Sequence, residues 1–254
     1  MKLAFMTSVA PQMTLAELIS AAQGFGYAGI EFRPEWKQAH GVELTASAAA
    51  RAEAKRRLQD AGIAGCCISP GVKFCHEDAA VREADAQKLE GYIELAAAVG
   101  IGHVRIFGDP IPNMGRAANY QQQAEYLAKG AKLAADAGVR LVMETHGTFR
   151  AFDMGEMLFR TAYPSALWVN WHLFHCLNHG EDIDEAYRHV KGRVAHVHFA
   201  LDEKASEWPS LRRQYALLKM EGYAGYWSVE VINPPEAVPV LVRHKQAWER
   251  LLAQ

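Results

Sequence analysis

Short runs of β-branched and aromatic residues alternate along the chain with longer runs rich in Ala, Leu, Glu, Lys and Gln. The first kind of run is typical of buried strands and the second of helices. The pattern predicts strands over residues 3–7, 29–32, 63–69, 104–107, 139–145, 167–172, 194–199 and 227–232. Helices are predicted between them, for example over residues 46–61, 79–99 and 117–137.

Glycines support this division of the chain. Each of six glycines closes a helical run just before a predicted strand: Gly26, Gly62, Gly100, Gly138, Gly192 and Gly222. Glycine is favoured there because the residue that follows a helix often adopts a positive φ. At one further junction, residues 163–165 (Tyr-Pro-Ser) stand in place of a glycine. The chain therefore consists of eight strand–helix units.

Such an alternation predicts a parallel sheet, and eight units in 254 residues suit a single (β/α)₈ TIM barrel. The alternative is an open, doubly wound sheet. It is disfavoured because the first strand-to-helix turn, residues 7–14, carries neither GxGxxG nor a P-loop lysine. No linker or low-complexity segment divides the chain, so we expect one domain over residues 1–254.

Composition and charge narrow the class of protein. The 27 Lys and Arg residues nearly balance the 29 Asp and Glu residues, which argues against nucleic acid or a membrane surface as partner. No apolar run is long enough to span a bilayer, and Pro11 interrupts the short apolar stretch at the start, against a signal peptide. The four cysteines form no CxxC pair, so free thiols and a cytoplasmic location are expected.

Four consecutive predicted strands end in side chains that can bind a metal: Glu144, His172, His198 and Glu230. In a TIM barrel the carboxyl ends of the strands form the active site. Any one of these residues alone is more simply explained as a structural group. Together, two carboxylates and two imidazoles are costly to bury unless a cation neutralises them. The pattern predicts one divalent ion, with Mn²⁺ or Zn²⁺ favoured and Co²⁺, Fe²⁺ and Mg²⁺ also compatible.

The same residues carry a family resemblance. Residues 29–32 (GIEF), 142–146 (VMETH), 171–175 (WHLFH), 196–198 (HVH) and 225–230 (GYWSVE) resemble the xylose isomerase-like TIM barrels, the sugar phosphate isomerase/epimerase superfamily. The resemblance spans the whole chain. It implies a small-molecule sugar or polyol substrate, and a homodimer or homotetramer. It also implies a metal held at the ends of the last four strands, by Glu144, His172, His198 and Glu230.

One position departs from the family pattern. Relatives usually carry Asp-x-x-His after the Trp of the sixth strand, whereas this chain has His172-Leu173-Phe174-His175. His172 occupies the register of that Asp and is our preferred ligand, with Asn170 or His175 as alternatives and a degenerate site as a third. With His172 as ligand, two carboxylates balance a doubly charged ion. We expect this to move the metal preference toward Zn²⁺ or Mn²⁺ and away from Mg²⁺.

The resemblance further implies proton transfer beside a carbonyl, through a metal-stabilised enediolate. Glu144 and Glu230 would then be the catalytic pair, on opposite faces of the substrate, with His175 and Lys204 as substrate contacts. His196 is expected to hydrogen-bond behind the site rather than to bind metal. Further candidate substrate contacts lie at or just after strand ends: His146, Arg105, Glu31, Trp36 and Phe107.

Alternatives stay open at this stage. A lyase of the inosose or dehydroshikimate dehydratase type would use the same site. An endonuclease IV-like repair enzyme is less compatible, because strands three and four end in residues 68–70 (ISP) and 107–109 (FGD), without the histidines of a trinuclear zinc cluster. A non-catalytic, sugar-binding barrel is the remaining class. Two opposed carboxylates argue against it.

Overall fold

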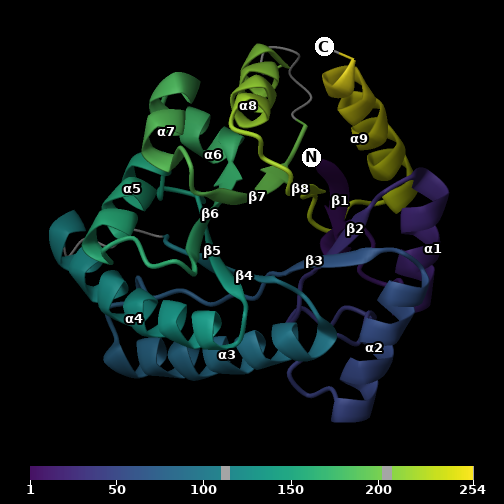
Figure 1. Ribbon diagram of the computed structural model, residues 1–254, viewed down its shortest axis with the longest axis horizontal. Coiled ribbons are helices and arrows are strands. Elements are labelled where there is room, and N and C mark those ends of the chain that lie inside the picture. The colour runs from purple at the N-terminus through teal and green to yellow at the C-terminus, as the bar shows by residue number, and fades with distance from the viewer. Residues whose placement is uncertain (110–114, 202–207, 254) are drawn as a thin grey trace.

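A computed structural model describes residues 1–109, 115–201 and 208–253. Its eight parallel strands close into a barrel in which each strand pairs with the next and β8 pairs with β1 (Figure 1). The predicted (β/α)₈ barrel is therefore confirmed. The strands are β1 (Lys2–Met6), β2 (Gly29–Phe32), β3 (Ala64–Ile68), β4 (His103–Phe107), β5 (Arg140–Glu144), β6 (Leu167–His172), β7 (Val194–Phe199) and β8 (Tyr226–Val229).

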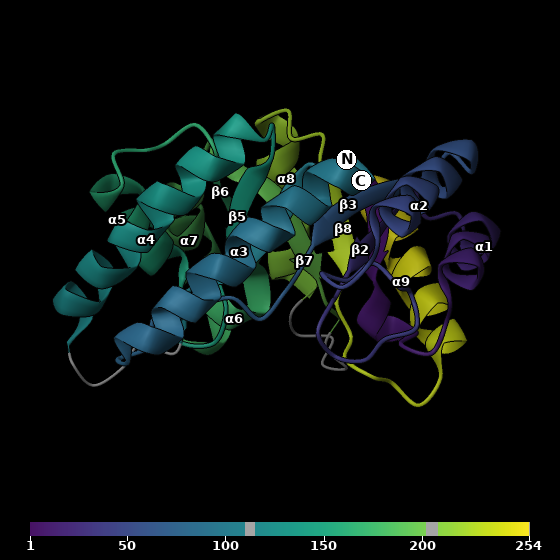
Figure 2. The same ribbon diagram turned by 90° about the horizontal axis from the view of Figure 1, so that it is seen from below.

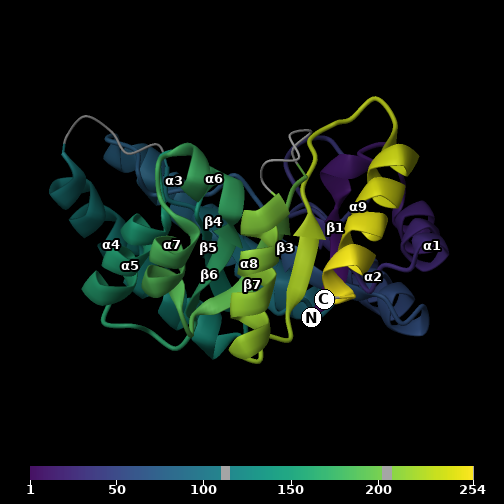
Figure 3. The ribbon, with the colours of Figure 1, turned by 90° about the horizontal axis from the view of Figure 1, so that it is seen from above.

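Helices surround the strands on the outside of the barrel, as Figures 1 and 2 show. In Figure 3 both termini lie at the end of the barrel where the strands begin, opposite the end toward which the arrowhead of β8 points. The helices are α1 (Leu15–Phe25), α2 (Ala48–Asp60), α3 (Ala79–Val99), α4 (Arg116–Asp136), α5 (Ala151–Arg160), α6 (Leu173–Asn178), α7 (Ile183–Val190), α8 (Trp208–Met220) and α9 (Ala237–Leu252), with a 3₁₀ turn η1 (Thr7–Val9) after β1.

Local sequence sets the helix ends. Thr14 begins α1 with a capping box, in which its side chain accepts from the N–H of Glu17 while the Glu17 carboxylate accepts from the N–H of Thr14. All six glycines predicted to end helices have positive φ, and at the junction without a glycine Ala162 and Tyr163 adopt positive φ instead. The glycine pattern therefore located the helix-to-strand junctions correctly.

The predicted strands at 29–32, 167–172 and 194–199 match the structure residue for residue. The eighth strand is shorter than predicted, because it ends at Val229 rather than at residue 232. Beyond it, the N–H of Glu230 still donates to the carbonyl of Phe199 (3.2 Å). The chain then turns toward η1, where the Ser8 hydroxyl donates to the carbonyl of Val231 (3.0 Å).

Two register shifts change which side chains enter the barrel. Where the β2–β3 pairing passes from Ile30 to Glu31 it skips Cys66 of β3, and where the β6–β7 pairing passes from Val169 to Asn170 it skips Ala195 of β7. Bulges of this kind re-aim side chains and are frequent next to active sites. The residue after each shift, Glu31 or Asn170, is fully buried and polar.

A small apolar cluster is formed by residues of the odd-numbered strands: Ala4, Cys66, Cys67, Val142 and Ala195. Alternate strands supply one layer of a TIM-barrel interior, which explains this grouping. The four cysteines are free, as predicted, and buried. None of the helices over the described residues is long and apolar enough to cross a membrane.

Candidate functional site

The four predicted metal-binding side chains meet at the carboxyl ends of β5 to β8. Glu144 ends β5, His172 ends β6, His198 lies in β7 and Glu230 follows β8 directly. One carboxylate oxygen of Glu230, Oε2, lies 3.2 Å from His172 Nε2 and 3.1 Å from His198 Nδ1. The same His198 nitrogen lies 2.8 Å from Glu144 Oε1. Residues from four strands therefore share one small volume.

Neighbouring backbone holds these side chains in place. Thr145 Oγ1 accepts a hydrogen bond from the His172 N–H (2.8 Å) and donates one to the His172 carbonyl (3.1 Å). These two bonds fix the backbone of His172 relative to β5. Glu230 is held on the other side by its N–H bond to β7. The site is thus built on strand ends rather than on long loops, which favours precise geometry.

The charges of the cluster support one another. Burial opposes charge on all three groups, but His198 lowers the pKa of Glu144 and holds the pKa of Glu230 well below its usual range. In return, Glu144, Glu230 and Glu31 raise the pKa of His198 well above its usual value despite burial. In the absence of an ion, this site therefore carries carboxylates around an imidazolium.

The arrangement fits a divalent cation. Ligand atoms of Glu144, His198 and Glu230 all lie within 4.8 Å of one another, and so do those of Glu144, His172 and His175. Two buried polar atoms at the site, Glu144 Oε2 and His172 Nδ1, accept or donate no hydrogen bond within the described part of the chain. A mixed set of carboxylate and imidazole ligands is what Zn²⁺ and Mn²⁺ accept readily.

Two arginines face the carboxylates. Arg105, from β4, is almost fully buried and its Nε lies 3.4 Å from Glu144 Oε2. Arg33, the residue after β2, is stacked on the ring of Trp36 at 3.7 Å. Burial and the neighbouring Arg105 lower the pKa of Arg33, while Glu230 and Glu144 oppose that shift. Both guanidinium groups are thus near enough to bind an anionic or oxygen-rich group at the site.

Two further histidines extend the cluster. The ring of His175, in α6, lies 4.2 Å from that of His172 and 4.5 Å from that of His146. His146 Nδ1 in turn lies 2.7 Å from a carboxylate oxygen of Asp109. Burial and the two neighbouring imidazoles lower the pKa of His175 to about 4, so this ring is neutral and can both donate and accept a hydrogen bond.

Residues 19–251 match the family model of the xylose isomerase-like TIM barrel. The chain belongs to the xylose isomerase-like TIM barrel family. No curated protein sequence matches it.

Solved structures share the fold of this xylose isomerase-like barrel. D-psicose 3-epimerase superposes with a TM-score of 0.79 at 18% identity, over 98% of both chains. The probable 3-DHS dehydratase AsbF of Bacillus anthracis gives 0.74 at 17% identity, over 98% of this chain and 99% of the other. The IolI protein, solved with a bound zinc atom, gives 0.78 at 15% identity, over 99% and 96%. Identities this low relate the folds alone.

The remaining predicted site residues of this xylose isomerase-like barrel lie in three places. Phe107 contacts both Arg105 (3.6 Å to the ring) and His146 (4.6 Å between ring centres). Trp36 is 40% exposed and lies beyond Arg33. Glu31 is fully buried behind His198. Lys204 lies outside the described residues.

Sequence reasoning missed Arg33 and Asp109. Each follows the end of a strand by one or two residues, whereas Glu144 and His172 are themselves the last residues of their strands. Arg33 lies one residue beyond the predicted strand 29–32, and Asp109 lies two residues beyond the end of β4, so the last residue of a strand does not indicate either. Charged residues within two positions after a strand end are the signal that indicates both.

Proposed function

We propose that this chain is a divalent-metal-dependent isomerase or epimerase of keto-sugars or polyols. The observation that carries the proposal is the meeting of Glu144 and Glu230 with His172 and His198 at the carboxyl end of the barrel. Membership of the xylose isomerase-like family supports it. So do the similar folds of a psicose 3-epimerase and of IolI with zinc.

Glu144, His172, His198 and Glu230 would hold the ion, with Zn²⁺ or Mn²⁺ favoured by the two imidazoles. Once bound, the ion would polarise a carbonyl group and stabilise the negative charge that develops on its oxygen. The donor set needs no other cofactor for this chemistry.

The protons are handled by the chain itself. Glu144 and Glu230 come from β5 and from the end of β8, so they approach the shared volume from different strands. In the proposed reaction one carboxylate removes the proton beside the carbonyl and the other returns it, on the opposite face for an epimerase. Glu144 Oε2, which accepts no hydrogen bond from the described residues and lies 3.4 Å from Arg105 Nε, would serve in this transfer.

Substrate oxygens would be held by the groups around the metal ligands. The imidazoles of His175 and His146 and the guanidinium of Arg105 lie on the side of β4 to β6. The guanidinium of Arg33 lies on the side of β2. Phe107 and Trp36 would supply apolar contact to the faces of a sugar. Lys204 remains a proposed contact from sequence.

Metal content and isotope exchange test the proposal. Purified protein should contain about one divalent ion per chain by ICP-MS. With a panel of keto-sugars in D₂O, we expect deuterium at the carbon next to the carbonyl. Glu144→Gln and Glu230→Gln should each reduce exchange by about 10²–10⁴-fold, the usual contribution of a general acid or base. Asp85→Asn, a buried acid in α3 bonded to the Lys73 N–H, is the matched control and should leave exchange unchanged.

The outcomes separate the classes. A product lighter by one water identifies a lyase working at the same site. Two or three zinc ions per chain favour a nuclease. A chain that takes up no metal after reconstitution and shows no deuterium exchange with any substrate of the panel overturns the proposal. That result favours a binding protein.

A further inference from the structure

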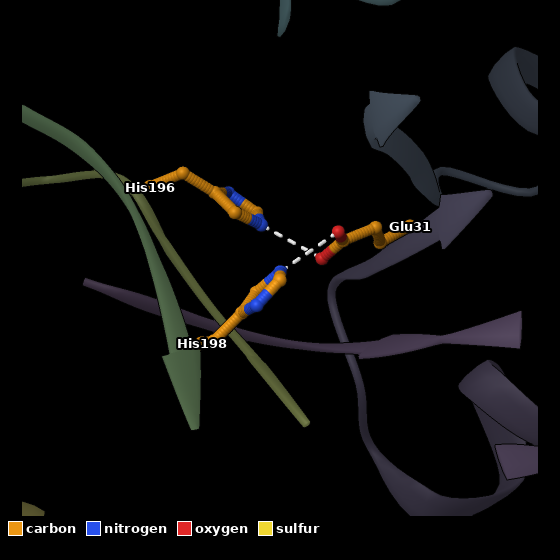
Figure 4. A group of neighbouring side chains, drawn as sticks. All are labelled: Glu31, His196 and His198. Atoms are coloured by element: carbon orange, nitrogen blue, oxygen red, sulfur yellow. Dashed lines mark hydrogen bonds and ion pairs between the residues drawn. The ribbon is translucent and has the colours of Figure 1, made fainter. Parts of the chain in front are cut away.

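Glu31 is the centre of a buried hydrogen-bond network that the proposed reaction does not use. Its carboxylate is fully buried, and it receives bonds from two histidines of β7 (Figure 4). His196 Nε2 lies 2.8 Å from Oε2 and His198 Nε2 lies 3.0 Å from Oε1. The Ser69 hydroxyl donates to Oε1 as well. Glu31 is therefore occupied by three donors, which leaves it poorly placed to touch a substrate.

His198 connects this network to the metal-binding cluster. One nitrogen of its ring, Nε2, faces Glu31, while the other, Nδ1, faces Glu144 Oε1 at 2.8 Å and Glu230 Oε2 at 3.1 Å. A neutral imidazole has one N–H and one lone pair, and the hydrogen bond at one nitrogen decides which is which. Without an ion both nitrogens face carboxylates and both carry protons. When an ion is bound, Nδ1 gives up its proton and turns its lone pair to the ion, whereas Glu31, whose carboxylate only accepts, keeps the proton on Nε2.

We infer that Glu31 is a positioning residue, which holds His198 by its Nε2–H so that Nδ1 is presented to a divalent ion. This inference rests on the metal site proposed above. It assigns Glu31 a role behind the ligands rather than at the substrate. An anionic partner also makes an imidazole a stronger ligand, because it stabilises positive charge on the ring.

His196 holds the second oxygen of the Glu31 carboxylate. Its Nε2 bonds to Oε2, so the carboxylate cannot rotate away from His198 without breaking a second bond. Both histidines lie on β7, two residues apart, and therefore point to the same side of the strand. The chain His196–Glu31–His198 thus ties β2 to β7 across the barrel, although the two strands are not neighbours in the sheet.

The same three residues could instead hold a second ion, since their ligand atoms lie within 4.8 Å of one another. The Ser69 hydroxyl argues against a second ion, because it donates to Glu31 Oε1 in addition to the two imidazoles. The carboxylate is therefore already satisfied by three hydrogen bonds.

Zinc affinity and the protonation of His198 test the inference. Glu31→Gln replaces one accepting oxygen by an NH₂ donor, so it cannot satisfy both imidazoles as they stand. We expect the dissociation constant for Zn²⁺, measured by competition with a chromophoric chelator, to rise about 10–100-fold, as is usual when the partner of a ligand histidine is lost. Glu31→Asp keeps the charge, so its dissociation constant for Zn²⁺ should lie between those of wild type and Glu31→Gln. Asp85→Asn again serves as the control and should bind Zn²⁺ like wild type.

A second readout needs no variant. In ¹⁵N-histidine-labelled, zinc-loaded wild type, long-range ¹H–¹⁵N spectra should show His198 protonated at Nε2 and metal-bound at Nδ1. Because the spectrum is recorded on wild type, misfolding of a variant cannot account for it.

The results that overturn the inference differ from those that overturn the proposed function. One ion per chain with undiminished affinity in Glu31→Gln refutes the role of Glu31 alone, and so does His198 protonated at Nδ1. A second ion that disappears in Glu31→Gln replaces the hydrogen-bond network by a metal site. A wild-type chain that takes up no divalent ion overturns the proposed function together with the inference.

Discussion

Acid should destabilise the chain through His40, a buried histidine of the segment between β2 and α2. Its Nδ1 accepts a hydrogen bond from the Val42 N–H (3.0 Å), and its Nε2 lies 3.3 Å from the carbonyl of Arg33. This pairing requires a neutral ring with its proton on Nε2. A second proton would place a donor opposite the Val42 N–H.

The magnitude follows from the pKa. Burial lowers the pKa of His40 from 6.5 to about 4, and the hydrogen bond to Arg33 only partly opposes this. Between these two values the unfolded chain binds a proton and the folded chain does not. Stability is therefore complete above about pH 6.5 and falls with decreasing pH, by about 1.4 kcal/mol per pH unit, until about pH 4. The whole window amounts to about 3 kcal/mol at this one residue.

Urea unfolding of wild type and His40→Asn at pH 7.5 and pH 4.5 isolates the effect. Asn does not titrate, yet its Oδ1 can still accept from the Val42 N–H. Other buried histidines, such as His103 and His244, titrate equally in both proteins and cancel from the difference. Wild type should lose about 2–3 kcal/mol more than the variant between the two pH values. Equal losses would refute the reasoning, because they would mean that His40 has the same pKa folded and unfolded.

Two further predictions concern the core and the metal. Trp227 packs at 5.7–6.0 Å, between ring centres, against Phe199, Tyr215 and Trp248, so Trp227→Ala should lower the free energy of unfolding by about 3–5 kcal/mol. The half-exposed Trp36→Ala is the control, and a similar loss in both variants would contradict the packing argument. Wild type should prefer Zn²⁺ to Mg²⁺, whereas His172→Asp should narrow that preference by adding a third carboxylate. Competition titrations measure both, and Mg²⁺ binding as tightly as Zn²⁺ in wild type would contradict His172 as a ligand.

The fold was predictable because its signals are local. The strand–helix units repeat the same three signals: an apolar run, a helix-forming run and, at six junctions, a glycine at the end of the helix. Each signal depends only on residues close together in the sequence. The end of β8 was predicted wrongly because long-range bonds decide it. Glu230 bonds to β7 and Val231 to η1, contacts that no neighbouring residue in sequence announces.

The site was partly predictable for the same reason. Barrel topology brings all strand ends to one place, so strand ends were enough to nominate Glu144, His172, His198 and Glu230 as neighbours. The sequence did not predict that His198 faces Glu31 with Nε2 and faces Glu144 and Glu230 with Nδ1. This arrangement depends on the register shifts that precede Glu31 and Asn170, and a shift of one residue leaves no trace in the apolar pattern.

The bonds of Glu31 have a consequence for how the barrel is assembled. Glu31 belongs to the first four strands and both imidazoles that satisfy it belong to the last four. If the barrel were cut between β4 and β5, one fragment would expose the Glu31 carboxylate with Ser69 as its remaining donor, and the other would expose the two imidazoles. The two halves of this chain are chemically incomplete as separate folding units, and only the closed ring of eight strands joins the acid to its bases.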